Sequence, residues 1–229
     1  MPPSQSRVHY LFIPVFIIQL LLYFTEQAAF LNILNIAYVA VLAVLLLRYT
    51  KLKGRFHKRV FSGLIVSIIG LLYFAFFQER YTTVFSSMLF YLLPQIFFIS
   101  AFYLDFKSAP ELDKRGARIA IALAFVISIS YYLLLRKDLG ILKIPVMLGL
   151  FTTCLMFMMA AFRNLRVNKE SFRLVVGAVL CYMVAEGLFA YHNFSQEIPG
   201  ISLIYAVFFT GALQLLVVGA ISRKLIHTN

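Results

Sequence analysis

One carboxyl group in this sequence stands deep inside an apolar stretch. The chain has nine acidic residues, and Glu186 lies roughly two helical turns before its apolar segment ends. An ionisable side chain in a bilayer is costly and usually faces a cavity or a partner. We therefore read Glu186 either as a hydrogen-bonded structural residue or as a buried acid that gives and takes a proton. The other eight fall in loops or near segment ends: Glu26, Glu79, Asp105, Glu111, Asp113, Asp138, Glu170 and Glu197.

Three glutamines also lie deep in apolar segments. Gln19, Gln95 and Gln214 are each expected to form a hydrogen bond between helices. Asp105, next to Tyr103, closes an apolar segment, and we predict a solvated helix end there.

Polar side chains also follow Glu186 along its own segment. Glu186 and Asn193 are seven residues apart and can share one helix face. Tyr191 and His192 lie between them, with His192 near the mouth of any pocket. We therefore expect a site in which Glu186 is catalytic and these polar residues, together with Gln95 and Gln214, bind the substrate.

The sequence gives no sign of a metal or cofactor. Both cysteines, Cys154 and Cys181, lie in apolar runs without metal or disulfide spacing. The four histidines are far apart in sequence and form no visible cluster.

The composition indicates a polytopic membrane protein. Of 229 residues, 62% are apolar and 13% charged, and the mean hydropathy is +0.89. Soluble domains carry about 45–50% apolar and about 25% charged residues. The net charge of +12 is attributed to loops beside anionic lipid headgroups and not to nucleic-acid binding, because no basic stripe lies outside short loops. Membrane lipids are thus the expected partners, and the oligomeric state stays open.

Apolar runs of about 20 residues, the length of one membrane crossing, predict an all-α bundle of eight transmembrane helices in a single domain, 1–229. Alternating the loops between two sides puts 17 of the 21 Lys and Arg residues on one side, so both termini are expected in the cytoplasm. The first run follows Arg7 like a signal peptide, but Gln27-Ala28-Ala29 is a poor cleavage site, which favours an uncleaved helix. The predicted spans are 8–24, 28–47, 60–78, 83–104, 117–135, 140–162, 172–194 and 199–222.

A short internal similarity predicts a parallel four-plus-four repeat. Setting Phe74-Ala75-Phe76 against Phe189-Ala190-Tyr191 gives an offset of 115 residues. The same offset pairs Leu71 with Glu186, and four extra loop residues pair Gln95 with Gln214. Parallel repeats of this kind occur in transporter folds.

Two segments resemble the YhhN family of lysoplasmalogenase-type membrane proteins. The stretch GAVLCYMVAEGLFAYHNF, 177–194, is similar to a family segment with a Gly-Ala pair followed by Ser-Asp, and Ala185-Glu186 stands at the Ser-Asp position. The stretch TGALQLLVVG, 210–219, is similar to the family's Ala-Ala-Gln element, with Gln214 at its Gln.

The sequence departs from this family at two other positions. The family's earlier Gly-Asp motif is represented here by Gly70-Leu71, so its first acid is absent. A family histidine on the fourth helix is represented by Gln95. The resemblance therefore leaves at most one deep carboxyl group, on Glu186.

The resemblance implies a cell-membrane enzyme that hydrolyses the sn-1 vinyl ether of lysoplasmalogens, a reaction that needs an acid and an oriented water. Because the acid at Leu71 is lost, two alternatives stay open. One is a non-catalytic protein that binds or senses lipid, and the other is a small transporter with Glu186 as proton carrier.

Overall fold

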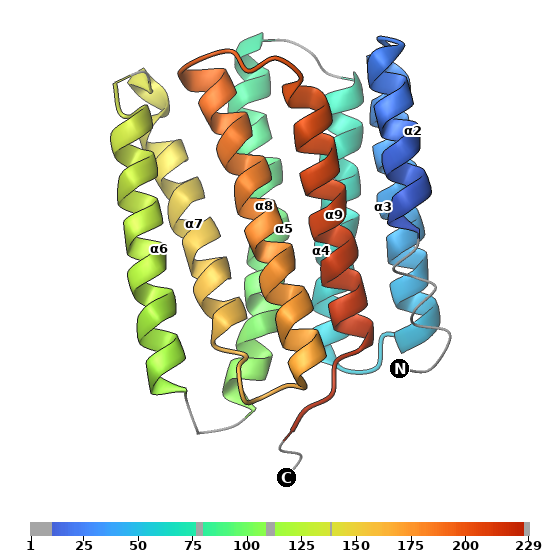
Figure 1. Cartoon of the computed structure of the whole chain (residues 1–229), viewed down its shortest axis with the longest axis vertical. Coiled ribbons are helices and arrows are strands. Elements are labelled where there is room, and N and C mark those ends of the chain that lie inside the picture. Colours follow the sequence, from blue (N-terminus) through green and yellow to red (C-terminus); the bar gives the residue numbers. More distant parts are fainter. Residues whose placement is uncertain (1–10, 77–79, 109–112, 138, 227–229) are drawn as a thin grey trace.

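The protein is a bundle of antiparallel helices (Figure 1). The computed structural model describes residues 11–76, 80–108, 113–137 and 139–226. Within these ranges there are eight α-helices and one 3-10 turn. The elements are α2 (Phe12–Phe24), α3 (Ala28–Thr50), α4 (Arg55–Phe76), α5 (Arg80–Lys107), α6 (Lys114–Leu135), η1 (Gly140–Leu142), α7 (Lys143–Ala161), α8 (Lys169–Phe194) and α9 (Ile201–Ile221).

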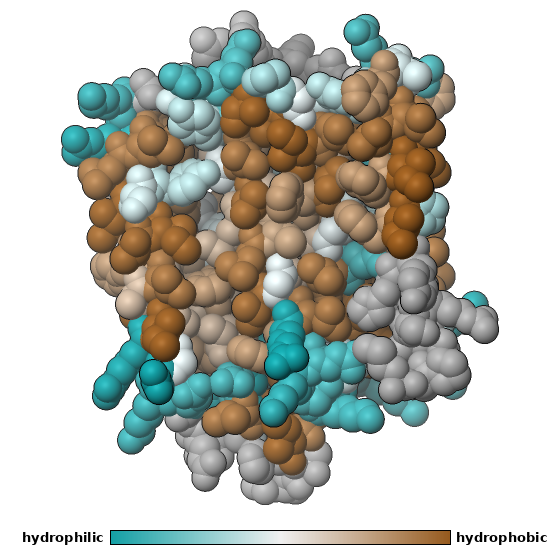
Figure 2. Space-filling model, in the orientation of Figure 1, coloured by the Kyte–Doolittle hydropathy of each residue, from teal (hydrophilic) through white to brown (hydrophobic). Residues whose placement is uncertain are grey.

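Six of the described helices, α3, α4 and α6 to α9, are long and apolar enough to cross a membrane. On the face that Figure 2 shows, apolar side chains cover the middle of the bundle and polar residues gather toward its two ends. The prediction of a helical multi-pass membrane protein is therefore confirmed. Helix α2 has 13 residues, about 20 Å, which is shorter than a bilayer core of about 30 Å. Part of the predicted span 8–24 lies outside the described residues, so the count of eight crossings stays a prediction.

Within the described residues, each predicted span overlaps one α-helix, the span 140–162 also includes η1, and most differences lie at the charged ends. Helix α4 begins at Arg55 and not at 60, α6 begins at Lys114 and not at 117, and α8 begins at Lys169 and not at 172. Lys and Arg stems can lie along apolar surface while their charges reach the headgroups. The helices therefore continue for about one turn beyond the apolar runs.

The helices pack in a pattern that relates the first four to the last four. Helices α8 and α9 lie in front of α4 and α5 in Figure 1, and the pairs α8–α9 and α4–α5 have the most extensive contacts. Helix α3 packs against both α4 and α9, and α7 packs against both α8 and α5. The outer helices differ, because α2 also reaches α9 whereas α6 also reaches α8. Among the described residues of the inner six helices, α4 also reaches α9, whereas α8 and α5 have no comparable contact. The four-plus-four repeat therefore stays a prediction.

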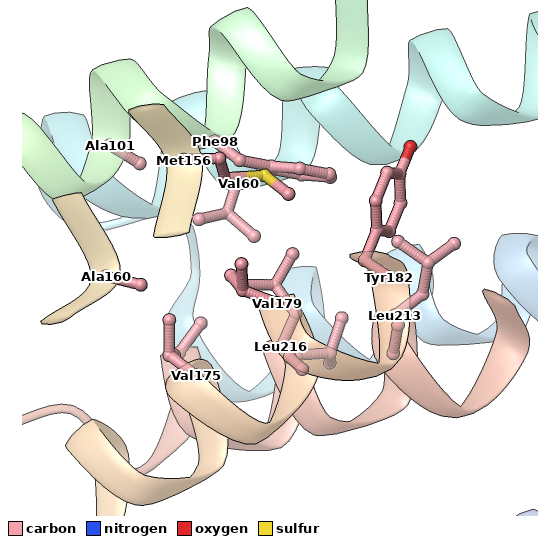
Figure 3. Packing of buried hydrophobic residues seen from close by; sticks show 14 of the residues in the cluster. Val60, Phe98, Ala101, Met156, Ala160, Val175, Val179, Tyr182, Leu213 and Leu216 are labelled. Carbon is pink, nitrogen blue, oxygen red and sulfur yellow. The ribbon is translucent and has the colours of Figure 1, made fainter. Parts of the chain in front are cut away.

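An apolar core joins the two helix pairs (Figure 3). Phe98 of α5 is 1% exposed and lies so close to Gly63 of α4 that a Cβ at Gly63 would overlap its ring. Val60 and Met156 pack beside Phe98, facing Val179 on the opposite pair. Glycine at position 63 thus permits the close approach of α4 and α5.

The end of the bundle that carries the α3–α4 and α7–α8 connections, here called the basic end, contains a buried ion cluster. Asp105 is fully buried, and its carboxylate accepts hydrogen bonds from Arg163 Nε at 2.8 Å and Arg223 Nη2 at 2.5 Å. The ring of Phe56 lies against both guanidinium groups. The prediction of a solvated helix end at Asp105 is therefore wrong. Its partners lie 58 and 118 residues further along the chain, and only the fold brings them together.

Candidate functional site

A cavity of about 570 Å³ lies between the α8–α9 and α4–α5 pairs, in the half of the bundle away from the basic end. Helices α3, α6 and α7 complete its wall. Its lining is mostly apolar, and it runs from Ser67 and Gln95 deep in the bundle to Asn193 and Ser202, both exposed, at the α8–α9 connection. The volume is within the range of about 300–1,000 Å³ that is typical of ligand pockets.

Glu186 lies in the wall of this cavity and is held by two buried side chains. Gln95 Nε2 of α5 donates a hydrogen bond to Glu186 Oε1 at 2.5 Å. Thr153 Oγ1 of α7 lies 2.8 Å from Glu186 Oε2 and 3.2 Å from Gln95 Oε1. The three side chains therefore form a closed ring, which we call the Glu186 ring.

The number of hydrogens in the Glu186 ring limits its possible states. A threonine hydroxyl has one hydrogen to donate. When Glu186 is ionised, Thr153 donates to Glu186, and Gln95 Oε1 receives no hydrogen from Thr153. When Glu186 carries a proton, it can donate to Thr153, which then donates to Gln95, and all three contacts are satisfied. Because an ionised carboxyl inside a membrane is costly, the second arrangement is favoured at rest. Thr153 can turn its hydroxyl to Glu186 whenever the proton leaves.

Three predicted residues lie between Glu186 and the mouth of the cavity. His192 and Asn193 both line it, whereas Tyr191 does not. His192 Nδ1 accepts a hydrogen bond from the Ile198 amide at 2.8 Å, which ties the end of α8 to the α8–α9 connection. Asn193 Nδ2 donates to the Phe189 carbonyl oxygen, and the Tyr191 hydroxyl donates to Gln196 Oε1.

The other two deep glutamines lie outside the Glu186 ring. Gln214 is buried in α9 and is not among the residues that line the cavity. Gln19 is fully buried, and its Nε2 donates to Asn35 Oδ1 at 2.9 Å and to Thr210 Oγ1 at 3.2 Å. Asn35 in turn lines the cavity. Gln19 and Gln95 thus form the hydrogen bonds between helices that the sequence predicts.

Sequence reasoning missed several polar residues of the cavity, among them Thr153, Asn35 and Tyr131. A hydroxyl or amide in an apolar helix is common and often bonds to its own backbone, so these residues gave no distinct signal in the sequence. Tyr131 is recognisable only from its contact with Gly187, the neighbour of Glu186.

Leu71, where the family resemblance expects the first acid, also lines the cavity. It comes from α4, while Glu186 comes from α8, so the two positions that the repeat pairs face one space. No group of three or more His, Cys, Asp or Glu residues that could hold a metal ion occurs among the described residues.

Comparison with known proteins supports the sequence resemblance over nearly the whole chain. No curated protein and no solved structure matches the sequence. The family model that matches is that of the YhhN family, over residues 9–220. This match covers the helices that form the cavity, its carboxyl group and the position of the missing acid, and it shows that the chain belongs to the YhhN family.

Proposed function

We propose that this protein hydrolyses the vinyl ether bond of lysoplasmalogen-type lipids within its cavity. The observation that carries the proposal is the carboxyl group of Glu186, which opens into an apolar cavity of about 570 Å³ in a membrane protein of the YhhN family. The apolar walls suit an alkenyl chain, and the Glu186 ring supplies a proton donor at the depth of the ether. Glu186 lies eight residues, or about 12 Å, before the end of α8.

The reaction converts R–CH=CH–O–R′ and water into the aldehyde R–CH2–CHO and the alcohol R′–OH. Protonated Glu186 gives its proton to the alkene carbon that does not carry oxygen, and the double-bond electrons form the new C–H bond. The neighbouring carbon becomes an oxocarbenium ion. Water adds to this carbon and gives a proton to the Glu186 carboxylate. The resulting hemiacetal then loses R′–OH as its own hydroxyl proton passes to the leaving oxygen.

A single carboxyl group can perform both proton transfers in turn. The carbon that receives the proton and the carbon that receives water are bonded to each other, so one group can serve both. Thr153 supports the change of charge, because its hydroxyl can donate to Gln95 before the transfer and to Glu186 after it. The proposed mechanism therefore does not require an acid at Leu71. General acid–base catalysis of this kind contributes typically about 10²–10⁴-fold to a rate.

The proposal also assigns a setting to the chain. We place it in the cell membrane with the basic end in the cytoplasm, following the distribution of Lys and Arg, so the cavity belongs to the opposite half of the bilayer. Membrane lipids and a lysophospholipid-type substrate are its proposed partners, and nucleic acid is not.

The direct test is release of aldehyde from lysoplasmalogen by the purified protein and by Glu186→Gln. We expect the substitution to abolish release, because an amide cannot protonate the alkene. Glu197→Gln is the matched control, since Glu197 is exposed in the α8–α9 connection and does not line the cavity. Release by Glu186→Gln at the wild-type rate would remove Glu186 from this role.

Two specific observations keep other functions in view. The family's first acid is replaced by Leu71 in the cavity wall, and a protein that only binds or senses lipid would not need that acid. If this is its function, lipid is retained through purification and a panel of lysolipids is not turned over.

The related packing of the two halves, and a single carboxyl group among the described residues that line the cavity, also suit a small proton-coupled transporter. Proton-coupled uptake in proteoliposomes would identify that function.

A further inference from the structure

Tyr131 of α6 presents a hydroxyl group to the cavity. It lines the cavity together with Glu186, although the two residues come from helices that meet at few points. Within the part of the chain that the structure describes, no side chain or backbone group is hydrogen-bonded to the Tyr131 hydroxyl. A half-buried hydroxyl usually has a protein, water or ligand partner. This one is therefore available to whatever occupies the cavity.

The position of the hydroxyl is fixed by a close contact with α8. A Cβ placed on Gly187 would overlap the Tyr131 hydroxyl and its ring carbon Cζ. The glycine at 187 therefore makes room for this tyrosine. The hydroxyl is thus held beside the backbone of Gly187, the residue that follows Glu186. Because the side chains of Tyr131 and Glu186 line the same cavity, a ligand that places its reactive bond at Glu186 can also reach Tyr131.

The substrate atoms next to the ether bond are known from the proposed substrate. This inference therefore rests on the proposed function. In a lysolipid, the ether oxygen is followed by one CH2 and then by the carbon that carries the free hydroxyl of the glycerol. A phenol both donates and accepts hydrogen bonds, which matches an alcohol.

We propose that the Tyr131 hydroxyl binds the free glycerol hydroxyl of a lysolipid and so selects lysolipids over lipids substituted at that oxygen. A blocked oxygen cannot donate to Tyr131, and its substituent would press against the Tyr131–Gly187 contact. Both effects weaken binding of the blocked lipid. Tyr131 acts here as a specificity residue and takes no part in the proton transfers assigned to Glu186.

The test is equilibrium binding of two lipids that the protein does not hydrolyse. The first is a 1-O-alkyl lysophosphocholine, whose saturated ether lacks the alkene, and the second is the same lipid with its glycerol hydroxyl methylated. We expect wild-type protein to bind the first about tenfold more tightly, as one hydrogen bond of about 1.4 kcal/mol would give. Tyr131→Phe removes the hydrogen bond and keeps the ring on Gly187, so its ratio of affinities should fall well below tenfold.

The matched control is Tyr132→Phe, which should keep the tenfold ratio. Tyr132 is half-buried on the same helix, does not line the cavity, and has Lys143 Nζ 5.8 Å from its ring centre. Gly187→Ala is a second variant, in which the added Cβ displaces the hydroxyl, and it should also lose the preference. A tenfold ratio retained by Tyr131→Phe, or no preference in the wild-type protein, would overturn the assignment.

The binding experiment measures no turnover, so its result is independent of whether the protein hydrolyses lysoplasmalogen. Loss of the preference in Tyr131→Phe, together with absence of aldehyde release by the wild type, would uphold the lipid site and reject the hydrolase. With an active enzyme, Tyr131→Phe should raise KM and leave kcat within a few-fold. A fall in kcat at unchanged KM would contradict the binding role and indicate a role in placing water.

Discussion

The Glu186 ring predicts that Glu186→Gln leaves the fold intact while it removes the acid. In the protonated state, Glu186 accepts from Gln95 at one oxygen and donates to Thr153 from the other. A glutamine at 186 reproduces this pattern, with its carbonyl facing Gln95 and its amide donating to Thr153. We expect its free energy of unfolding to stay within about 1 kcal/mol of wild type, the net worth of one hydrogen bond.

Glu186→Leu, by contrast, removes the hydrogen-bond partner of both Gln95 and Thr153. Gln95 is 1% exposed and Thr153 is 8% exposed, so their polar atoms lose a buried partner, at a cost of about 1–3 kcal/mol. Thermal unfolding of the two variants in the same detergent measures the difference. At about 2–4 °C per kcal/mol for a chain of this length, Glu186→Leu should unfold several degrees below Glu186→Gln.

This comparison tests whether the contacts of Gln95 and Thr153 stabilise the site, which no activity assay does. Because the Thr153 hydroxyl can turn, a glutamine at 186 keeps both contacts and a leucine keeps neither. If Glu186→Gln unfolds at the same temperature as Glu186→Leu, the closed ring contributes nothing measurable to stability and this reasoning is refuted.

Three further results are expected. Leu71→Asp, which places a second carboxyl in the cavity, should raise aldehyde release above wild type, whereas Leu71→Asn should not. Asp105→Asn should lower the free energy of unfolding by about 3–5 kcal/mol, because it leaves buried arginine without its counter-charge. Glu197→Gln, at an exposed position in the α8–α9 connection, should be nearly neutral when both are unfolded in detergent. In a background without the native cysteines, Asn193→Cys should react with an impermeant thiol reagent from outside intact cells, and Lys51→Cys should react only after the cells are opened.

The helices were predictable because membrane segments obey a length rule. An apolar run of about 20 residues has few alternatives to a helix in lipid, and within the described residues each predicted span overlaps an α-helix. Sequence could not supply the exact ends, such as Arg55 and Lys114, because a basic side chain at the surface can belong to a helix or to a loop. Helix α2, with 13 residues, is shorter than this rule expects, and the start of its predicted span lies outside the described residues.

The acid of the site was predictable, whereas its surroundings were only partly so. Glu186 was distinctive because a deep carboxyl needs a partner or a cavity, and it has both. Gln95 was a reasonable partner as a deep amide, but Thr153 resembled any other helix hydroxyl. For Asp105 the predicted environment was wrong. A carboxylate near a helix end suggests exposure to solvent, but the fold brings Arg163 to it and buries both. Which residues converge depends on helix packing, which a single sequence does not encode in a readable way.

The packing of the two halves explains why one half can hold the acid alone. The α5–α7 interface carries Gln95 and Thr153, and the related α9–α3 interface carries Thr210 and Asn35, joined through Gln19. Both interfaces bring a polar side chain to the same cavity, at Thr153 and at Asn35. Among the described residues that line the cavity, Glu186 is the one carboxyl group, because Leu71 stands where the predicted repeat would place its counterpart. The two interfaces therefore bring similar polar groups to the cavity and differ in their acid, so in the proposed reaction a lipid meets the proton donor on the α8 wall and an apolar leucine on the α4 wall.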